Sequence, residues 1–204
     1  MITVLESVAS APLAVRMPSS VVEMNDDQFF DFCQANRELR IERTAEGDVL
    51  IMPLAGFGSG RRNAAINARL FNWAERNGTG VVLDSSTGFR LPNRAVRSPD
   101  AAWILKSRLE AFSKEEQEKF LPLCPDFVIE LKSPTDRLVD LKNKMVEYVD
   151  NGARLGWVLD PEARQVLVYR PGRAVEVLVR PETLSGDPEL PGFVLDLRGI
   201  WEPE

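Results

Sequence analysis

Histidine is absent from the 204-residue chain, and only two cysteines are present, Cys33 and Cys124. The absence of histidine excludes a Ser-His-Asp triad, a Cys-His dyad and a histidine-ligated zinc site. Two isolated cysteines cannot form a four-cysteine zinc site either. A metal would therefore need oxygen ligands, which favours magnesium or manganese. Cysteines this far apart also fit a reducing cytoplasm better than a disulfide framework.

Other absences narrow the class of protein. No apolar run approaches the length of a membrane span, so we expect no membrane partner. The glycine-rich segment at residues 56–60 lacks the Lys-Ser/Thr pair of a phosphate-binding loop, and we interpret it as a flexible loop. Basic residues are fewer than acidic residues, which gives a net charge of -6, whereas nucleic-acid binders usually carry a basic surface. The arginines within residues 90–97 could still position a phosphate backbone, or they could belong to a solvated loop.

The order of the patterns predicts a mixed β-sheet flanked by helices, an α/β (α+β) fold. Residues 1–20 are interpreted as a loose leader and residues 21–204 as a single domain. Apolar periodicity predicts helices at about 28–37, 61–76 and 137–151. Short apolar or alternating runs predict strands at about 40–43, 48–52, 81–84, 87–91, 101–105, 127–131, 155–159, 164–169 and 175–179.

The most informative segment places a carboxylate and a lysine two positions apart within an apolar run. Alternation along a strand puts Glu130 and Lys132 on one face, opposite Phe127, Ile129 and Leu131. A second carboxylate, Asp100, opens the apolar run at residues 101–105. Carboxylates bind a divalent cation through hard oxygen ligands, and a lysine can stabilise an oxyanion. This residue set is what metal-assisted cleavage of a phosphodiester requires.

These segments together resemble the PD-(D/E)xK nuclease superfamily, and more narrowly the Uma-two family of proposed restriction endonucleases. The resemblance rests first on Ser-Pro-Asp at residues 98–100 and on Pro-Asp-Phe-Val-Ile-Glu-Leu-Lys-Ser-Pro-Thr-Asp at residues 125–136. Further similar segments are an early hairpin, with Arg-Ile-Glu at residues 40–42 and Gly-Asp-Val-Leu-Ile-Met-Pro at residues 47–53, then Ser-Thr-Gly-Phe-Arg-Leu-Pro at residues 86–92 and Leu-Pro-Gly-Phe at residues 190–193. The resemblance covers about residues 23–201.

The resemblance implies a restriction-endonuclease-like fold and a magnesium-dependent endonuclease that acts on DNA, and the two separated cysteines place this activity in the cytoplasm. Asp100 and Glu130 would bind Mg²⁺ or Mn²⁺, with help from the backbone carbonyl of Leu131. Lys132 would contact the attacking water. Glu42 matches an acidic position of the early hairpin loosely and is a possible additional ligand. Family analogy and the usual two-fold symmetry of soluble assemblies predict a homodimer.

Simpler interpretations stay open at this point. Glu130 and Lys132 could form a structural ion pair, and Glu42 could be a solvated residue at a strand edge. Lys144 could reach a phosphate, but a solvated helix face is the simpler interpretation. The rival function is an interaction or nucleic-acid-binding module that keeps the fold and has little catalytic power. An RNA-processing nuclease is a second rival. No separate specificity domain is recognisable, so the sequence predicts no cleavage specificity.

Overall fold

A computed structural model gives the structure of the protein and describes residues 13–15 and 24–202. The leader expected at residues 1–20 lies outside the described residues except for a short strand at residues 13–15. Among the described residues, no helix is both long and apolar enough to cross a membrane.

The described residues form thirteen strands and six helices. The strands are β1 (Leu13–Val15), β2 (Arg40–Arg43), β3 (Val49–Met52), β4 (Gly80–Asp84), β5 (Phe89–Arg90), β6 (Val96–Arg97), β7 (Ala101–Leu105), β8 (Phe127–Leu131), β9 (Leu155–Asp160), β10 (Gln165–Tyr169), β11 (Glu176–Val179), β12 (Thr183–Ser185) and β13 (Val194–Asp196). The helices are α1 (Asp26–Ala35), α2 (Phe57–Asn77), α3 (Lys106–Leu109), α4 (Lys114–Gln117), α5 (Leu138–Asp150) and α6 (Arg198–Trp201).

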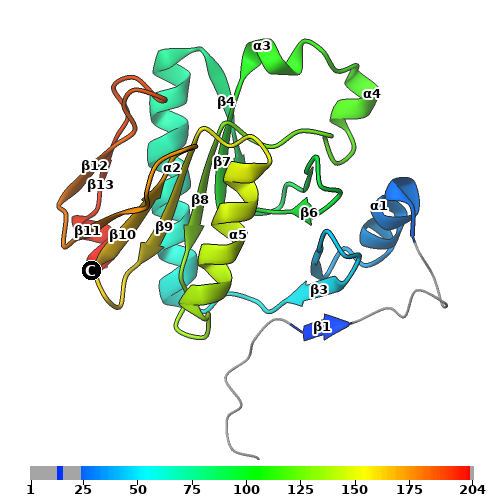
Figure 1. Cartoon of the computed structure of the whole chain (residues 1–204), viewed down its shortest axis with the longest axis horizontal. Coiled ribbons are helices and arrows are strands. Elements are labelled where there is room, and N and C mark those ends of the chain that lie inside the picture. Colours follow the sequence, from blue (N-terminus) through cyan, green and yellow to red (C-terminus); the bar gives the residue numbers. More distant parts are fainter. Residues whose placement is uncertain (1–12, 16–23, 203–204) are drawn as a thin grey trace, which may run out of the picture.

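The centre of the molecule is a six-stranded mixed sheet in the order β11-β10-β9-β8-β7-β4. Strands β8 and β9 are parallel and are connected through α5, whereas the other neighbouring pairs are antiparallel. The helices α2 and α5 lie on opposite sides of this sheet (Figure 1). The prediction of a mixed sheet flanked by helices is therefore confirmed.

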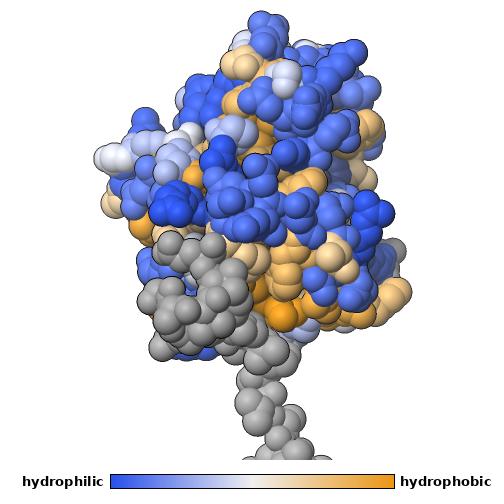
Figure 2. All heavy atoms as spheres, turned by 90° about the vertical axis from the view of Figure 1, so that its right-hand side faces the viewer, coloured by the Kyte–Doolittle hydropathy of each residue, from blue (hydrophilic) through white to orange (hydrophobic). Residues whose placement is uncertain are grey.

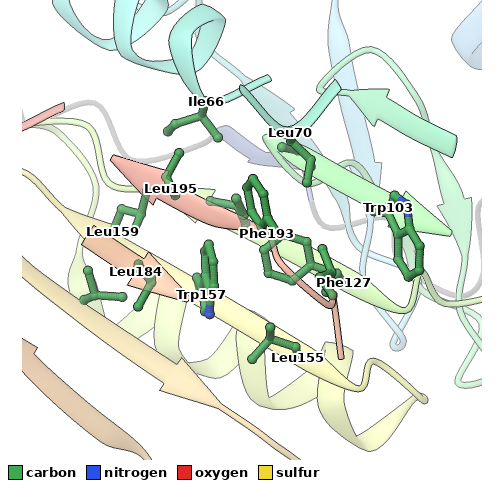
Figure 3. Packing of buried hydrophobic residues seen from close by; sticks show 14 of the residues in the cluster. Ile66, Leu70, Trp103, Phe127, Leu155, Trp157, Leu159, Leu184, Phe193 and Leu195 are labelled. Atoms are coloured by element: carbon green, nitrogen blue, oxygen red, sulfur yellow. The ribbon is translucent and has the colours of Figure 1, made fainter. Parts of the chain in front are cut away.

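The alternation of side chains along β8 separates two cores. Phe127, Ile129 and Leu131 pack on the side of α2, and Val128 packs with Met145 on the side of α5. On the α2 side, the rings of Trp157 and Phe193 are stacked with centroids 5.8 Å apart (Figure 3). With one face fixed by this aromatic core, the other face of β8 and the polar end of the strand are directed toward α5.

A second, five-stranded sheet has the order β1-β3-β2-β6-β5, and β12 pairs with β13 in a small third sheet. In the second sheet β2 lies between β3 and β6, so it is an inner strand. Figure 2 looks onto the side of the molecule that carries α1 and this sheet, and shows hydrophobic side chains gathered below a largely hydrophilic area. As an inner strand, β2 places Glu42 in a buried environment.

Two local interpretations of the sequence differ from the structure. The segment at residues 56–60 is not a flexible loop, because Phe57–Gly60 form the first turn of α2 and the N–H of Gly60 donates to the carbonyl of Gly56 at 2.9 Å. Glycine disfavours a helix interior but costs only about 1 kcal/mol there, so a long helix tolerates it. Ser-Pro-Thr-Asp at residues 133–136 is typical of a helix start and predicts a cap for the helix that follows. In the structure Asp136 accepts from the N–H of Ser133 at 2.7 Å, and Arg137 is the N-cap residue of α5.

Candidate active site

The site is organised around the ammonium group of Lys144, which lies between two buried carboxylates. Lys144 Nζ is 2.8 Å from Oε1 of Glu42 and 2.9 Å from Oε1 of Glu130. The three side chains come from α5, β2 and β8. A buried cation shared by two carboxylates offsets much of the cost of removing these charges from water. The contact also links the two large sheets.

Asp100 lies at the start of β7 and is held by the end of β8. Its Oδ2 atom accepts from the backbone N–H of Leu131 at 2.9 Å, and its Oδ1 atom is 3.4 Å from Nη1 of Arg40. Its backbone carbonyl accepts from the side-chain amide of Asn67 on α2 at 2.9 Å. These contacts fix Asp100 beside the residue that follows Glu130.

Further polar groups complete the network around the carboxylates. Arg97 lies 3.3 Å from Oε2 of Glu42 and 2.5 Å from Oε2 of Glu147, and the N–H of Ser98 donates to Oε1 of Glu42 at 3.1 Å. Tyr148 donates its hydroxyl to Oε1 of Glu130 at 3.1 Å. The buried carboxylates are thus hydrogen-bonded as well as paired, as buried charges require.

Burial and neighbouring charges shift the pKa values of Glu42, Glu130 and Lys144 in different directions. Burial raises the pKa of Glu130 to about 7; Lys144 opposes this effect, and the negative charges of Asp100 and Glu42 add to it. Burial also acts to raise the pKa of Glu42, but the positive charges of Lys144 and Arg97 outweigh it and lower the pKa. For Lys144, burial acts to lower the pKa, and the two carboxylates outweigh it and raise the pKa. The lysine therefore stays charged, while Glu130 can exchange a proton near neutral pH.

Lys132 follows the last residue of β8, and its ammonium group binds elsewhere. Its Nζ atom is 3.1 Å from Oε2 of Glu162 and 4.0 Å from Oδ1 of Asp160, both from the hairpin between β9 and β10. Asp100, Glu42, Glu130 and Lys144 line one pocket, and Lys132 is not among the residues that line it.

This pocket has a volume of about 880 Å³ and lies between the β3–α2 connection, the ends of β7 and β8, and the N-terminal half of α5. Its deep wall carries the carboxylates. Nearer the outside it is lined by Leu54, Phe57, Arg62 and Arg137. The volume is within the range of pockets that bind small molecules or parts of larger ligands.

The structure brings together the predicted Asp100 and Glu130 with the two residues named only as possible additions, Glu42 and Lys144. The interpretation of Glu42 as a solvated strand-edge residue is wrong, because β2 is an inner strand and Glu42 is 1% exposed. The solvated-face interpretation of Lys144 is wrong as well. One signal in the sequence could have indicated its position, since Lys144 is one helical turn before the buried Tyr148.

Other members of the network have no marker in the sequence. Arg40 and Glu147 look like ordinary surface charges until the fold places them beside Asp100 and Arg97.

The oxygen donors suit a hard divalent cation that keeps part of its water shell. Within residues 13–15 and 24–202, no three acidic or cysteine side chains are close enough together to form a metal cage. Magnesium commonly binds through one or two carboxylates and retains several waters, so Asp100 and Glu130 fit it better than they fit calcium, which takes more ligands.

Comparison with known proteins agrees with this architecture. The profile of the Uma2 family, described as "Putative restriction endonuclease", matches residues 26–198. The chain belongs to the Uma2 family. Its structure is also similar to the crystal structure of "a putative nuclease belonging to DUF820" from Anabaena variabilis ATCC 29413, with a TM-score of 0.68 and 18% identity over 79% of this chain and 89% of that one. A search of curated proteins gives no match. The resemblance and the nuclease-like fold expected from the sequence are thereby confirmed.

The raised pKa of Glu130 predicts how stability depends on pH in metal-free buffer. Between its unfolded pKa of about 4.3 and its folded pKa of about 7, the folded Uma2 protein keeps a proton that the unfolded chain releases. Wild-type stability should therefore fall as pH rises through this range, and Glu130→Gln should lack that part of the fall. We expect the free energy of unfolding of Glu130→Gln, relative to wild type, to rise by on the order of 2 kcal/mol from pH 5 to pH 8.

Urea unfolding at several pH values measures this difference. Glu176→Gln, which removes an exposed carboxylate on β11, is the control. A constant difference between Glu130→Gln and wild type across this range would contradict the raised pKa.

Proposed function

We propose that this Uma2 protein is a metal-dependent endonuclease that hydrolyses DNA phosphodiester bonds. The observation that carries the proposal is the convergence of Asp100, Glu130 and Lys144 in one pocket. Two carboxylates and a lysine, held by buried and fully hydrogen-bonded strands and a helix, supply the groups that phosphodiester hydrolysis needs. The family description and the similar nuclease fold support the same reaction class.

In the proposed mechanism Asp100 and Glu130 would hold Mg²⁺ or Mn²⁺, and the backbone carbonyl of Leu131 would be a further ligand. A divalent cation supplies water activation and neutralises charge on the phosphate. The N–H of Leu131 orients Asp100, and Tyr148 orients Glu130. Both carboxylates are thus positioned before a substrate arrives, which lowers the cost of reaching the reactive geometry.

The geometry supports Lys144 over Lys132 as the lysine that acts on the phosphate. Lys144 lies 2.9 Å from Glu130 on the wall of the pocket, and its pKa is raised, so it donates protons in hydrogen bonds without losing its charge. We propose that its ammonium group donates to a phosphate oxygen as negative charge develops in the transition state. Lys132, bound to Glu162, then stabilises the end of β8.

A nucleic-acid-binding module with little catalytic power is the second candidate. Its support is the tight pairing of Lys144 with Glu42 and Glu130, which could be purely structural. RNA is an alternative substrate for the nuclease. Cleavage assays with plasmid DNA, branched DNA and RNA in Mg²⁺ and in Mn²⁺ separate the three possibilities.

Metal binding should stabilise the folded protein, because a ligand that binds only the native state adds stability by mass action. At a free Mg²⁺ or Mn²⁺ concentration of about 100 times the Kd, the gain should be about 2.7 kcal/mol. Calorimetric titration and thermal unfolding measure both quantities. Asp100→Asn should lose the binding heat, and Asp31→Asn on α1 should retain it. Equal heats for wild type and Asp100→Asn would remove the proposed metal site.

Substitutions of Lys144 and Lys132 should have different effects on the rate of cleavage. Lys144→Met should lower kcat by about 100- to 1000-fold, as expected for a lost group that stabilises developing charge. Lys132→Ala should leave most of the activity, because its ammonium group binds Glu162. The reverse order of the two activities would assign the catalytic role to Lys132.

Lys144→Met also leaves two buried carboxylates without their cation, which can cost about 3–5 kcal/mol. Circular dichroism should therefore confirm that the variant is folded before activities are compared. The double variant Glu42→Gln, Lys144→Met removes one of the two uncompensated charges and should recover part of the stability. It should remain inactive if Lys144 is catalytic.

We also propose that the protein is a homodimer in the cytoplasm. Two-fold symmetry is the commonest assembly of soluble proteins and would present two sites to the two strands of a duplex. Cys33 and Cys124 are both free thiols, which suits a reducing compartment. Sedimentation equilibrium at micromolar concentration should give twice the mass of the chain, 22.9 kDa. A single-chain mass would rule out a dimer under these conditions.

A further inference from the structure

Leu54 and Phe57 are the most exposed large hydrophobic side chains of the described residues, at 96% and 87%. Leu54 lies within the connection between β3 and α2, and Phe57 is the first residue of α2. Full burial of a side chain of this size is worth about 1.5–3 kcal/mol, and folding gains almost none of it at these two positions. Exposed hydrophobic side chains mark a ligand-binding surface where they lie together in a groove or pocket rather than singly.

These two side chains belong to the pocket of the candidate active site. Leu54 and Phe57 line the same pocket as Asp100, Glu130 and Lys144. Phe57 is the first residue of α2, and Asn67 of the same helix donates to the backbone carbonyl of Asp100. One rigid helix therefore connects the exposed ring to the carboxylate site.

The surroundings of Phe57 allow a planar ligand to approach closely. A Cβ atom added at Gly56 or at Gly60 would meet no atom within 4 Å, so the backbone on both sides of the ring is open. Arg62 and Arg137 line the pocket as well. Arg62 Nε donates to the carbonyl of Ile200 at 2.7 Å and Arg137 Nε lies 3.9 Å from Oδ2 of Asp140, so a phosphate would be bound by the other N–H groups of these guanidinium groups. An open aromatic face beside cationic side chains is the arrangement by which proteins bind single-stranded nucleic acid.

We infer that Leu54 and Phe57 form a platform on which a base of the nucleic-acid substrate stacks while its phosphate lies at the carboxylate site. The inference rests on the proposed nuclease function and adds a substrate class to it, namely strands with unstacked bases. Phe57 has no polar atom with which to read a base edge, so the platform does not discriminate between bases. A base within an intact duplex is already stacked on its neighbours, so single-stranded, frayed or branched substrates bind better than intact duplex.

The position of the pair favours a nucleic acid over a protein partner. A protein interface needs a continuous apolar centre with charged residues depleted from it. Leu54 and Phe57 instead share their pocket with arginines and buried carboxylates. This mixture suits a ligand that carries an aromatic ring and a phosphate close together.

Binding of a short fluorescein-labelled oligo(dT) in EDTA, where no metal-dependent cleavage occurs, tests the platform directly. Phe57→Ala should weaken binding about ten-fold. Phe71→Ala is the matched control, because Phe71 is on the same helix and is also exposed, at 52%, but lies about 21 Å further along and outside the pocket. Since Phe57 is almost fully exposed, its removal should leave the fold intact.

Phe57→Trp provides a readout that does not depend on activity. It should bind oligo(dT) at least as tightly as wild type, and its added tryptophan emission should be quenched on binding. Wild type supplies the background of its four tryptophans, of which Trp73, Trp103 and Trp157 are buried and Trp201 is partly buried. Unchanged binding by Phe57→Ala, or unchanged emission from Phe57→Trp at saturating oligo(dT), would overturn the platform. A third outcome would also overturn the platform: Phe57→Ala has a lower mass than wild type in sedimentation but binds oligo(dT) equally well. Leu54 and Phe57 would then form a contact between two copies of the chain.

Failure of the platform and failure of the nuclease proposal are distinguishable. If oligo(dT) binds through Phe57 but no DNA or RNA is cleaved in Mg²⁺ or Mn²⁺, the nuclease proposal fails and the platform remains. If wild type and Phe57→Ala cleave single-stranded and branched DNA equally, the nuclease proposal remains and the platform fails.

Discussion

The contact between Lys144 and the carboxylates of Glu42 and Glu130 is the constraint on which the site depends. Each carboxylate belongs to a different sheet, and the lysine comes from the helix between β8 and β9. If any one of the three charges were removed, the others would be left buried without full compensation, which is far costlier than losing a surface ion pair. The relative position of the two large sheets and the position of α5 are therefore coupled to the electrostatics of the pocket.

The same contact explains why two glutamates in one site behave differently. Glu42 is ion-paired with both Lys144 and Arg97 and is held in its charged form. Within the described residues Glu130 is ion-paired with Lys144, and Asp100 and Glu42 act on it as neighbouring negative charges. Environment separates their pKa values, as it does for paired carboxylates in other sites. Glu130 is thus the group that can exchange a proton for another cation near neutral pH, and Glu42 is the permanent anchor for the lysine.

Local patterns in the sequence predicted what local physics determines. Alternation along residues 127–131 predicted the correct two faces of β8. The order of helical and apolar patterns predicted a mixed sheet flanked by helices, and in the structure this sheet contains the parallel pair β8–β9 connected through α5. The prediction of a loop at residues 56–60 was wrong, because the low helix propensity of the glycines is outweighed by the rest of a 21-residue helix.

The residues that the sequence did not assign depend on contacts between distant parts of the chain. Lys144 and Glu42 are 102 residues apart, and no periodicity within either segment predicts that they meet. Lys132 shows the opposite case, in which neighbours in the sequence have different partners in the structure. Its proximity to Glu130 in the sequence favoured a shared site, but β8 ends at Leu131, and beyond that point the nearest carboxylates decide where the ammonium group binds. Motif spacing constrains the backbone, whereas the partner of a long flexible side chain is a property of the tertiary structure.

The chain is acidic, whereas the proposed nucleic-acid substrate is a polyanion, so the two repel each other at long range. With a net charge of -6, long-range attraction cannot supply much of the affinity, and few phosphates can be neutralised by the arginines of one pocket. A protein that relied on phosphate contacts alone would then bind weakly, and what affinity it had would fall with salt in proportion to the few contacts made. Stacking of a base on an exposed ring contributes affinity that salt does not screen, so a shallow salt dependence is the behaviour expected of an acidic nuclease that uses Phe57 in this way.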